Sequence, residues 1–201
     1  EKTGQKNRKK LVYSFFLCIF AAKFSYSMDL SIIVPVYNVE KYVKPCIESI
    51  FKQGLDDADY EVIIVNDGCT DRSMEMISDI IQAHNNIIVV NQENQGLSVA
   101  RNHGISVAKG DYILMPDSDD LLIENSLHPL LENAIEAQAD LIVADYISMT
   151  DEEIENSNAP QIQKTDYNYV EKTGEDLLLY DLNPYQCFIW RTLFRREFLI
   201  I

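Results

Sequence analysis

Three aspartates stand within four positions at 117–120 ("DSDD"), directly behind the apolar run "YILM" at 112–115. Carboxylates packed this closely repel one another, and ionising all of them is costly unless a cation is present. Mg²⁺ and Mn²⁺ favour oxygen ligands, often one or two carboxylates together with substrate phosphates. Asp117 and Asp119 therefore indicate a metal site, and the alternative is a solvated surface turn.

Two further segments carry side chains suited to a polar ligand. In "NDGCTD" at 66–71, Asp67 can accept hydrogen bonds from a base or a sugar, or the segment can be a plain turn before a helix. In "NQGLSVARN" at 94–102, Arg101 can face a diphosphate in an acidic cleft or form a surface ion pair. Neither motif decides between its alternatives by itself.

The chain lacks the glycine-rich loops that usually bind phosphate: it has no GxxxxGK[ST], and no GxGxxG follows the first apolar run. A metal is thus the expected partner of any phosphate. His84, His103 and His128 have no partners at ligand spacing and receive no chemical role. Trp190 is interpreted as a packing residue, with a platform for a sugar ring as the alternative.

Five short apolar runs rich in Val and Ile must position these side chains, and they are predicted to be buried parallel strands. They are Ser31–Val36, Glu61–Val65, Ile87–Val90, Tyr112–Met115 and Asp140–Ala144. Amphipathic segments between and after them predict helices at Glu40–Gln53, Arg72–Ala83, Leu97–Lys109 and Asn125–Gln138. This alternation predicts an α/β layered fold with right-handed crossovers.

Polar residues follow every one of these runs: Tyr37 and Asn38, Asn66 and Asp67, Asn91 and Gln92, Asp117 to Asp120, and Asp145 and Tyr146. In an open α/β sheet the ligand lies outside the carboxyl ends of the strands. Parallel strands would gather these polar residues along one edge. The pattern favours a binding site over an isolated acidic turn.

Composition narrows the class of protein. The 201 residues are 47% hydrophobic and 24% charged, typical of one globular domain. A net charge of −15 argues against nucleic acid as a partner. The four widely spaced cysteines, which form no CxxC pair, are predicted to be reduced thiols of a cytosolic protein: Cys18, Cys46, Cys69 and Cys187.

Residues 1–27 differ from the rest of the chain. They carry a charge of +5, which leaves −20 for residues 28–201, and they include the apolar run "LVYSFFLCIFAA" at 11–22. This run resembles the apolar part of a signal peptide and is short for a membrane span. The tail is expected to lie outside the working fold, with a short membrane anchor as the alternative and secretion as the least favoured reading. Residues 150–170 are predicted to be a loop, and residues 174–182 a short helix.

Four segments together resemble family 2 glycosyltransferases of the GT-A fold, in order and at the usual separations. They are "SIIVPVYNVEKYVKPCIESI", "VIIVNDGCTDRS", "NQGLSVARNHGISVAKGDYILMPDSDD" and "WRTLFRREFL". The resemblance covers Asp29 to about Leu199. Within the family, the chain most resembles bacterial enzymes of surface polysaccharide synthesis. Cys69 departs from the family, which commonly has Ser there.

The resemblance implies a Rossmann-like, mostly parallel sheet flanked by helices. It implies inverting transfer of a sugar from a nucleotide diphosphate sugar, UDP-linked in many members, to a hydroxyl of a saccharide or lipid-linked saccharide, with Mn²⁺ or Mg²⁺. Residues 28–120 would form the nucleotide-binding half and residues 121–201 the start of the acceptor half. A cytoplasmic location is expected, with peripheral association at the inner face of the membrane left open.

The resemblance also implies roles for single residues. The nucleotide would contact Pro35, Val36, Tyr37, Asp67, Arg101, Asp117 and Ser118. Asp67 would contact the base, and Asp119 would hold the metal together with Asp117, with Asp120 behind them. The catalytic base is not assigned, because inverting members carry it in an acidic motif downstream of the "WRTLFRREF"-like segment, and the chain is expected to be incomplete there.

Two other functions remain open on the sequence alone. A metal-dependent sugar nucleotidyltransferase would normally have a phosphate loop rich in glycine and lysine after its first strand, and "PVYNVEKY" does not provide one. A noncatalytic nucleotide-sugar binding domain would use the same pocket without turnover.

Removal of residues 1–27 is expected to leave folding and nucleotide binding intact, because the strand and helix pattern begins after Met28. Thermal unfolding and UDP titration with Mn²⁺ should give the same result for the full chain and for residues 28–201. A truncated protein that fails to fold would show that the tail belongs to the domain.

Overall fold

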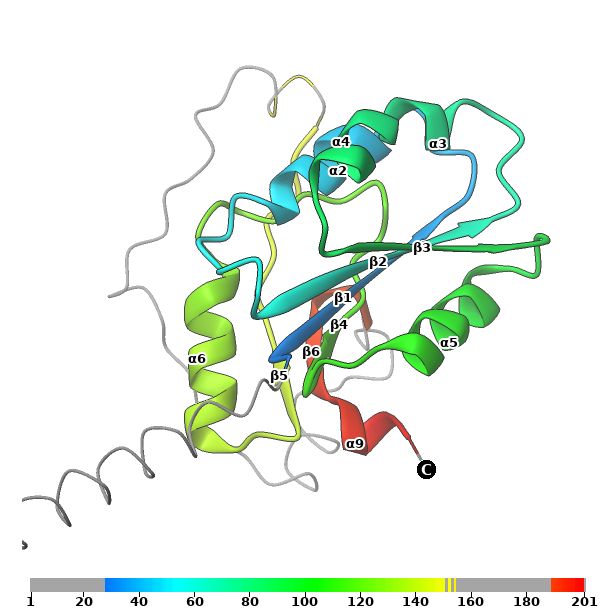
Figure 1. Cartoon of the computed structure of the whole chain (residues 1–201). Coiled ribbons are helices and arrows are strands. Elements are labelled where there is room, and N and C mark those ends of the chain that lie inside the picture. Colours follow the sequence, from blue (N-terminus) through cyan, green and yellow to red (C-terminus); the bar gives the residue numbers. More distant parts are fainter. Residues whose placement is uncertain (1–27, 151, 153, 155–188, 201) are drawn as a thin grey trace, which may run out of the picture.

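The computed structural model describes residues 28–150, 152, 154 and 189–200. Its strands are β1 (Leu30–Val36), β2 (Tyr60–Asp67), β3 (Ile87–Gln92), β4 (Tyr112–Leu114), β5 (Leu141–Val143) and β6 (Thr192–Arg195). They form one six-stranded sheet in the order β3-β2-β1-β4-β6-β5 (Figure 1). Strands β1 to β4 are parallel, and β6 pairs antiparallel with both β4 and β5. Strand β5 therefore runs in the same direction as β4.

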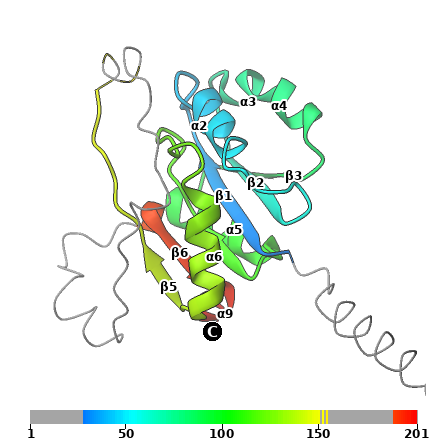
Figure 2. The ribbon, with the colours of Figure 1, turned by 90° about the vertical axis from the view of Figure 1, so that its left-hand side faces the viewer.

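Helices cover both faces of the sheet (Figures 1 and 2). One face packs against α2 (Val43–Ile50), α4 (Ser78–Ala83) and α6 (Leu127–Ala137), with the short α3 (Ser73–Met76) beside them. The other face packs against α5 (Leu97–Val107) and the short α9 (Arg196–Leu199). A 3₁₀ turn, η3 (Ile189–Arg191), leads into β6. The mixed α/β fold class predicted from the sequence is confirmed.

Strand β1 lies at the centre of the parallel part of the sheet and is buried along its whole length. Its residues alternate between two apolar cores: Ile32 and Val34 face the α2 side, and Ile33 faces α5. Strands β2 and β4 alternate in the same way. Burial on both faces explains why these strands read as continuous apolar runs in the sequence.

Helix α5 approaches the sheet more closely than an ordinary residue would allow at Gly104. A Cβ built there would lie 2.3 Å from Cγ2 of Ile33, a side chain with no exposed surface. Gly104 is therefore the contact that sets the depth of α5 on β1.

The helices α2 and α6 each carry a proline in the first turn, where the backbone N–H has no partner within the helix.

Several sequence predictions need correction. The helix predicted at 72–83 is two helices, α3 and α4, because the backbone leaves helical geometry at the buried Ile77 (φ −112°, ψ 6°). Strands β3 and β5 are only half-buried, because they form the two edges of the sheet. Asp67 is the last residue of β2 and does not follow it. Strand β6 was not predicted.

Within the described residues, no helix is long and apolar enough to cross a membrane. The predictions for residues 1–27, for most of the loop at 150–170 and for the helix at 174–182 lie outside the described residues, as do Cys18 and Cys187.

Replacing Gly104 with alanine should lower the free energy of unfolding by about 1–3 kcal/mol, because the new methyl group overlaps Ile33. Chemical denaturation measures the change. Asn102→Ala is the matched control, since Asn102 is exposed on the same helix and alanine favours helices. Equal stability of the two variants would contradict the close contact between α5 and β1.

Candidate active site

A cavity of about 430 Å³ opens at the carboxyl ends of β1, β2 and β4. The chain runs from β1 to β2 and β3 on one side and reaches β4 on the other, so the cavity lies at a topological switch point, where α/β folds bind ligands. Its size falls within the usual range for small-molecule sites. The lining residues are Pro35, Val36, Tyr37, Val39, Asp67, Asn94, Gly96, Leu97, Ala100, Asp117, Ser118 and Asp119.

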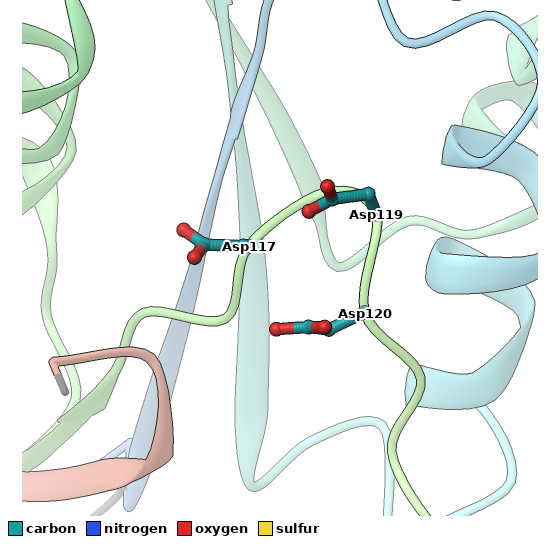
Figure 3. Close-up of side chains that lie close together, drawn as sticks. All are labelled: Asp117, Asp119 and Asp120. Carbon is teal, nitrogen blue, oxygen red and sulfur yellow. The ribbon is translucent and has the colours of Figure 1, made fainter. Parts of the chain in front are cut away.

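Three carboxylates come together on the loop that follows β4. Asp117, Asp119 and Asp120 each offer an oxygen, and these oxygens lie within 4.8 Å of one another. In Figure 3 the side chains of Asp119 and Asp120 point toward the limb of the loop that carries Asp117. A cluster of hard oxygen donors at this spacing fits the coordination chemistry of Mg²⁺ or Mn²⁺.

The cluster carries an electrostatic cost. Burial raises the pKa of Asp117, and the neighbouring Asp119 raises it further, while the Arg101 guanidinium opposes both effects. Burial also raises the pKa of Asp120, as do the charges of Asp119 and Asp117. Both shifts mean that ionisation is disfavoured here, and a bound cation would relieve the repulsion.

Arg101 forms an ion pair with one member of the cluster. Its Nη2 lies 2.5 Å from Oδ1 of Asp117, and the two side chains are 13% and 30% exposed. Arg101 was predicted either to face a diphosphate or to pair at the surface, and the structure gives a half-buried pair with a site carboxylate. Arg101 thus lies behind the cavity wall and fixes the orientation of Asp117.

Cys46 of α2 lies under the same loop. Its Sγ donates a weak hydrogen bond to the carbonyl oxygen of Asp117 at 3.6 Å. Burial, followed by the charges of the three aspartates, raises the pKa of the Cys46 thiol to about 12. The thiol is therefore protonated at neutral pH. Cys46 and Cys69, the two cysteines among the described residues, form no disulfide.

Asp67 is the most heavily hydrogen-bonded carboxylate of the site. Although only 2% exposed, it lines the cavity. Its Oδ1 accepts hydrogen bonds from Gln92 Nε2 and from the backbone N–H of Gln95, both at 2.8 Å. Its Oδ2 accepts one from the backbone N–H of Gly96 at 3.0 Å. Because each oxygen has two lone pairs, one acceptor position remains, on Oδ2.

The loops that follow β1 and β2 bind each other next to Tyr37 and Val39 of the cavity lining. Asn38, in left-handed conformation at φ 53°, accepts hydrogen bonds through Oδ1 from the backbone N–H groups of Thr70 and Asp71. Asp71 in turn accepts a hydrogen bond from the backbone N–H of Glu40, and the Glu40 carboxylate accepts one from the backbone N–H of Arg72. These reciprocal contacts hold the ends of β1 and β2 in a fixed relation.

Six of the seven predicted nucleotide-contacting residues line the cavity, and Arg101 lies one contact behind it. Sequence reasoning missed the residues contributed by the start of α5 and by the loop after β1, which are Val39, Asn94, Gly96, Leu97 and Ala100. The "NQG" motif contained a clue, since Gly96 at φ 86° starts α5 directly beside the cavity. Trp190 packs edge-on against Tyr146, with ring centroids 5.4 Å apart.

The mostly parallel sheet, with helices on both faces and an acidic cluster beside a cavity at its switch point, is an α/β fold of the GT-A type. The sequence profile of glycosyl transferase family 2 matches residues 31–199. The chain belongs to that family. This membership favours a glycosyltransferase over the sugar nucleotidyltransferase that the sequence alone left open.

Curated relatives agree with this assignment. Glycosyltransferase GlyA of Streptococcus pneumoniae is 39% identical over 124 residues, which is 62% of this chain and 18% of GlyA. The uncharacterized glycosyltransferase EpsJ of Bacillus subtilis is 49% identical over 72 residues, which is 36% of this chain and 20% of EpsJ. The chain thus matches about a fifth of the length of these two relatives.

The crystal structure of Staphylococcus aureus TarS, residues 1–349, has a similar fold. It superposes with a TM-score of 0.68 at 25% identity and covers 85% of this chain and 48% of the TarS chain.

Asp120→Asn should stabilise the metal-free protein at pH 7, raising Tm by about 1–3 °C. Because the pKa of Asp120 is raised, the folded state binds more protons than the unfolded chain above the ordinary carboxyl pKa. Its contribution to stability is present at low pH and is lost as pH rises through the raised pKa. The difference in Tm between Asp120→Asn and the wild type should accordingly become smaller as the pH is lowered.

Thermal unfolding in EDTA from pH 3 to pH 8 measures this difference. Asp111→Asn is the control, because it removes one exposed carboxylate outside the cluster. If both variants follow the same pH dependence, the effect comes from net charge, and the repulsion within the cluster is not its cause.

Proposed function

We propose that the protein to which this chain belongs transfers a sugar from a nucleoside diphosphate sugar to a hydroxyl group of a cell-surface polysaccharide, with inversion. The observation that carries the proposal is the acidic cluster at the rim of a nucleotide-sized cavity at the switch point. Residues 28–120 would bind the donor, and residues 121–201 would begin the acceptor part. A cytoplasmic location follows from where nucleotide sugars are made, and peripheral membrane association is part of the same proposal.

Asp119 and Asp117 would hold a divalent cation, with Asp120 behind them. Asp119 is exposed at the cavity, whereas Asp117 is already fixed by Arg101, so the two offer one free and one oriented carboxylate. A bound Mn²⁺ or Mg²⁺ supplies positive charge that offsets the charge of the departing diphosphate. Arg101, placed beside Asp117, adds a second positive charge close to this position.

The hydrogen bonds of Asp67, which lines the cavity, favour uracil as the base of the nucleotide. Guanine presents two adjacent donors, N1–H and N2–H, which suit both oxygens of a carboxylate. Uracil presents one N3–H donor, which suits the single acceptor position left on Asp67. TarS has been crystallised with UDP and with UDP-GlcNAc. The mannosyltransferase PcManGT, with a TM-score of 0.50, holds GDP-Man and Mn²⁺, so the fold alone does not decide the base.

The acceptor class is supported by the names of relatives. GgaB of Bacillus subtilis is a minor teichoic acid biosynthesis protein, and a poly(ribitol-phosphate) beta-glucosyltransferase of Bacillus spizizenii is another relative. We therefore propose a saccharide or lipid-linked saccharide acceptor. Attack by its hydroxyl needs a general base. None of the described carboxylates is assigned to that role.

Asp119→Ala and Asp67→Ala should have different effects on nucleotide binding. Loss of Asp119 should abolish the dependence of UDP binding on Mn²⁺ and, where turnover is measurable, lower it by about a hundredfold. Loss of Asp67 should weaken UDP binding by about 1–3 kcal/mol and leave the dependence on Mn²⁺ in place. Isothermal titration with UDP, in Mn²⁺ and in EDTA, separates the two effects.

Asp111→Ala is the control for a lost surface carboxylate. Asp67→Ala should also lower Tm, because two backbone N–H groups lose their acceptor, so each variant is titrated only after its unfolding curve is recorded. The proposed roles would be overturned if Asp67→Ala lost the dependence of UDP binding on Mn²⁺ while Asp119→Ala kept it. Wild-type protein that binds UDP equally well in EDTA would overturn the metal site.

A further inference from the structure

Gln92 of β3 decides how many hydrogen bonds Asp67 can still accept. Its Nε2 occupies one lone pair of Asp67 Oδ1, at 2.8 Å, while the N–H of Gln95 occupies the other. The second of these donors is backbone and is present whatever the side chain at 95. The first depends on the side chain at 92 alone. Gln92 is therefore the one variable donor on this oxygen.

The orientation of the Gln92 amide follows from its neighbours. A carboxylate only accepts hydrogen bonds, so the NH₂ group of Gln92 must face Asp67. The amide oxygen then points away from Asp67, and Oε1 lies 2.9 Å from Nδ1 of His103 in α5. Because Oε1 is an acceptor, Nδ1 of His103 must carry the proton. The chain His103, Gln92, Asp67 thus has one consistent direction of donation.

We propose that Gln92, held by His103, is a specificity-determining residue that makes Asp67 a one-donor site and so favours uracil over guanine. With Gln92 in place, Asp67 keeps one acceptor position, on Oδ2. Without the amide donor, Oδ1 regains a lone pair, and the carboxylate can accept the paired N1–H and N2–H donors of guanine. The inference rests on the proposed nucleotide site.

His103 is a positioning residue, because it contacts Gln92 and orients the amide that donates to Asp67. It joins α5 to the edge strand β3 through Gln92, and β3 pairs with β2 next to Asp67, at Asp67↔Gln92 in the register. Strand β3 has no further strand outside it within the described sheet, so the side chain at 92 depends on α5 for its support. Loss of His103 should therefore loosen the amide and leave its chemistry unchanged.

The test compares UDP and GDP affinities, with Mn²⁺, in four variants of the full chain. Gln92→Met keeps the length of the side chain and removes its donor. It should lower the ratio of GDP to UDP dissociation constants by about tenfold, the scale of one hydrogen bond to a charged acceptor. His103→Leu should lower the ratio by about twofold to threefold. His103→Asn restores a donor near the position of Nδ1 and should recover the wild-type ratio. Gln82→Leu changes an exposed glutamine on α4 and is the control.

The outcomes are separable from those of the proposed function. Wild-type protein that binds neither nucleotide overturns the proposed function and the inference with it. Wild-type protein that binds GDP as tightly as UDP overturns the inference alone. If Gln92→Met weakened the binding of UDP and of GDP equally, the inference would also be overturned, since Gln92 would then only support the fold. If Gln92→Met does not fold, the pair His103→Leu and His103→Asn decides, and an unchanged ratio in both contradicts the proposal.

Discussion

The site depends on a difference in length between neighbouring parallel strands. Strands β1 and β2 stay paired up to Val36 and Asn66, whereas the pairing of β1 with β4 ends at Ile32 and Leu114. The backbone after Leu114 leaves the sheet four residues before β1 ends. The space beside the last residues of β1 is then bounded by loops and by the start of α5, and this is where the cavity lies. A β4 that ran to the full length of β1 would fill the site with sheet.

Charge at this edge is distributed unevenly. The chain as a whole carries −15, and three carboxylates meet where only Arg101 is placed to offset them directly among the described side chains. Burial, and after it the repulsion from neighbouring aspartates, raises the pKa values of Asp117 and Asp120. The charges of the three aspartates also add to burial in raising the pKa of the buried Cys46. An arrangement that is costly in the free protein is suited to a cation and an anionic ligand that arrive together.

Sequence patterns predicted the parallel strands and the acidic cluster because both depend on local periodicity and on position after a strand. They did not predict β6, since four residues, Thr192–Arg195, are too few for a periodic signal and their partners in β4 and β5 are remote in the chain. They also gave His103 no role, because its partner Gln92 is eleven residues away and belongs to another element. Motifs located most of the polar residues that line the cavity, whereas the residues that position them depend on tertiary pairing.

Helix α5 is a single rigid piece that serves several parts of the site. Gly104 fixes its depth against Ile33, Ala100 and Leu97 line the cavity, Arg101 pairs with Asp117, and His103 supports Gln92. Substitutions at these five positions are expected to affect one another, because all five side chains or contacts depend on how α5 packs on the sheet. In evolutionary terms, the helix is a block of coupled positions. A single residue grafted into α5 would therefore alter the cavity together with the contacts of its neighbours on the same helix.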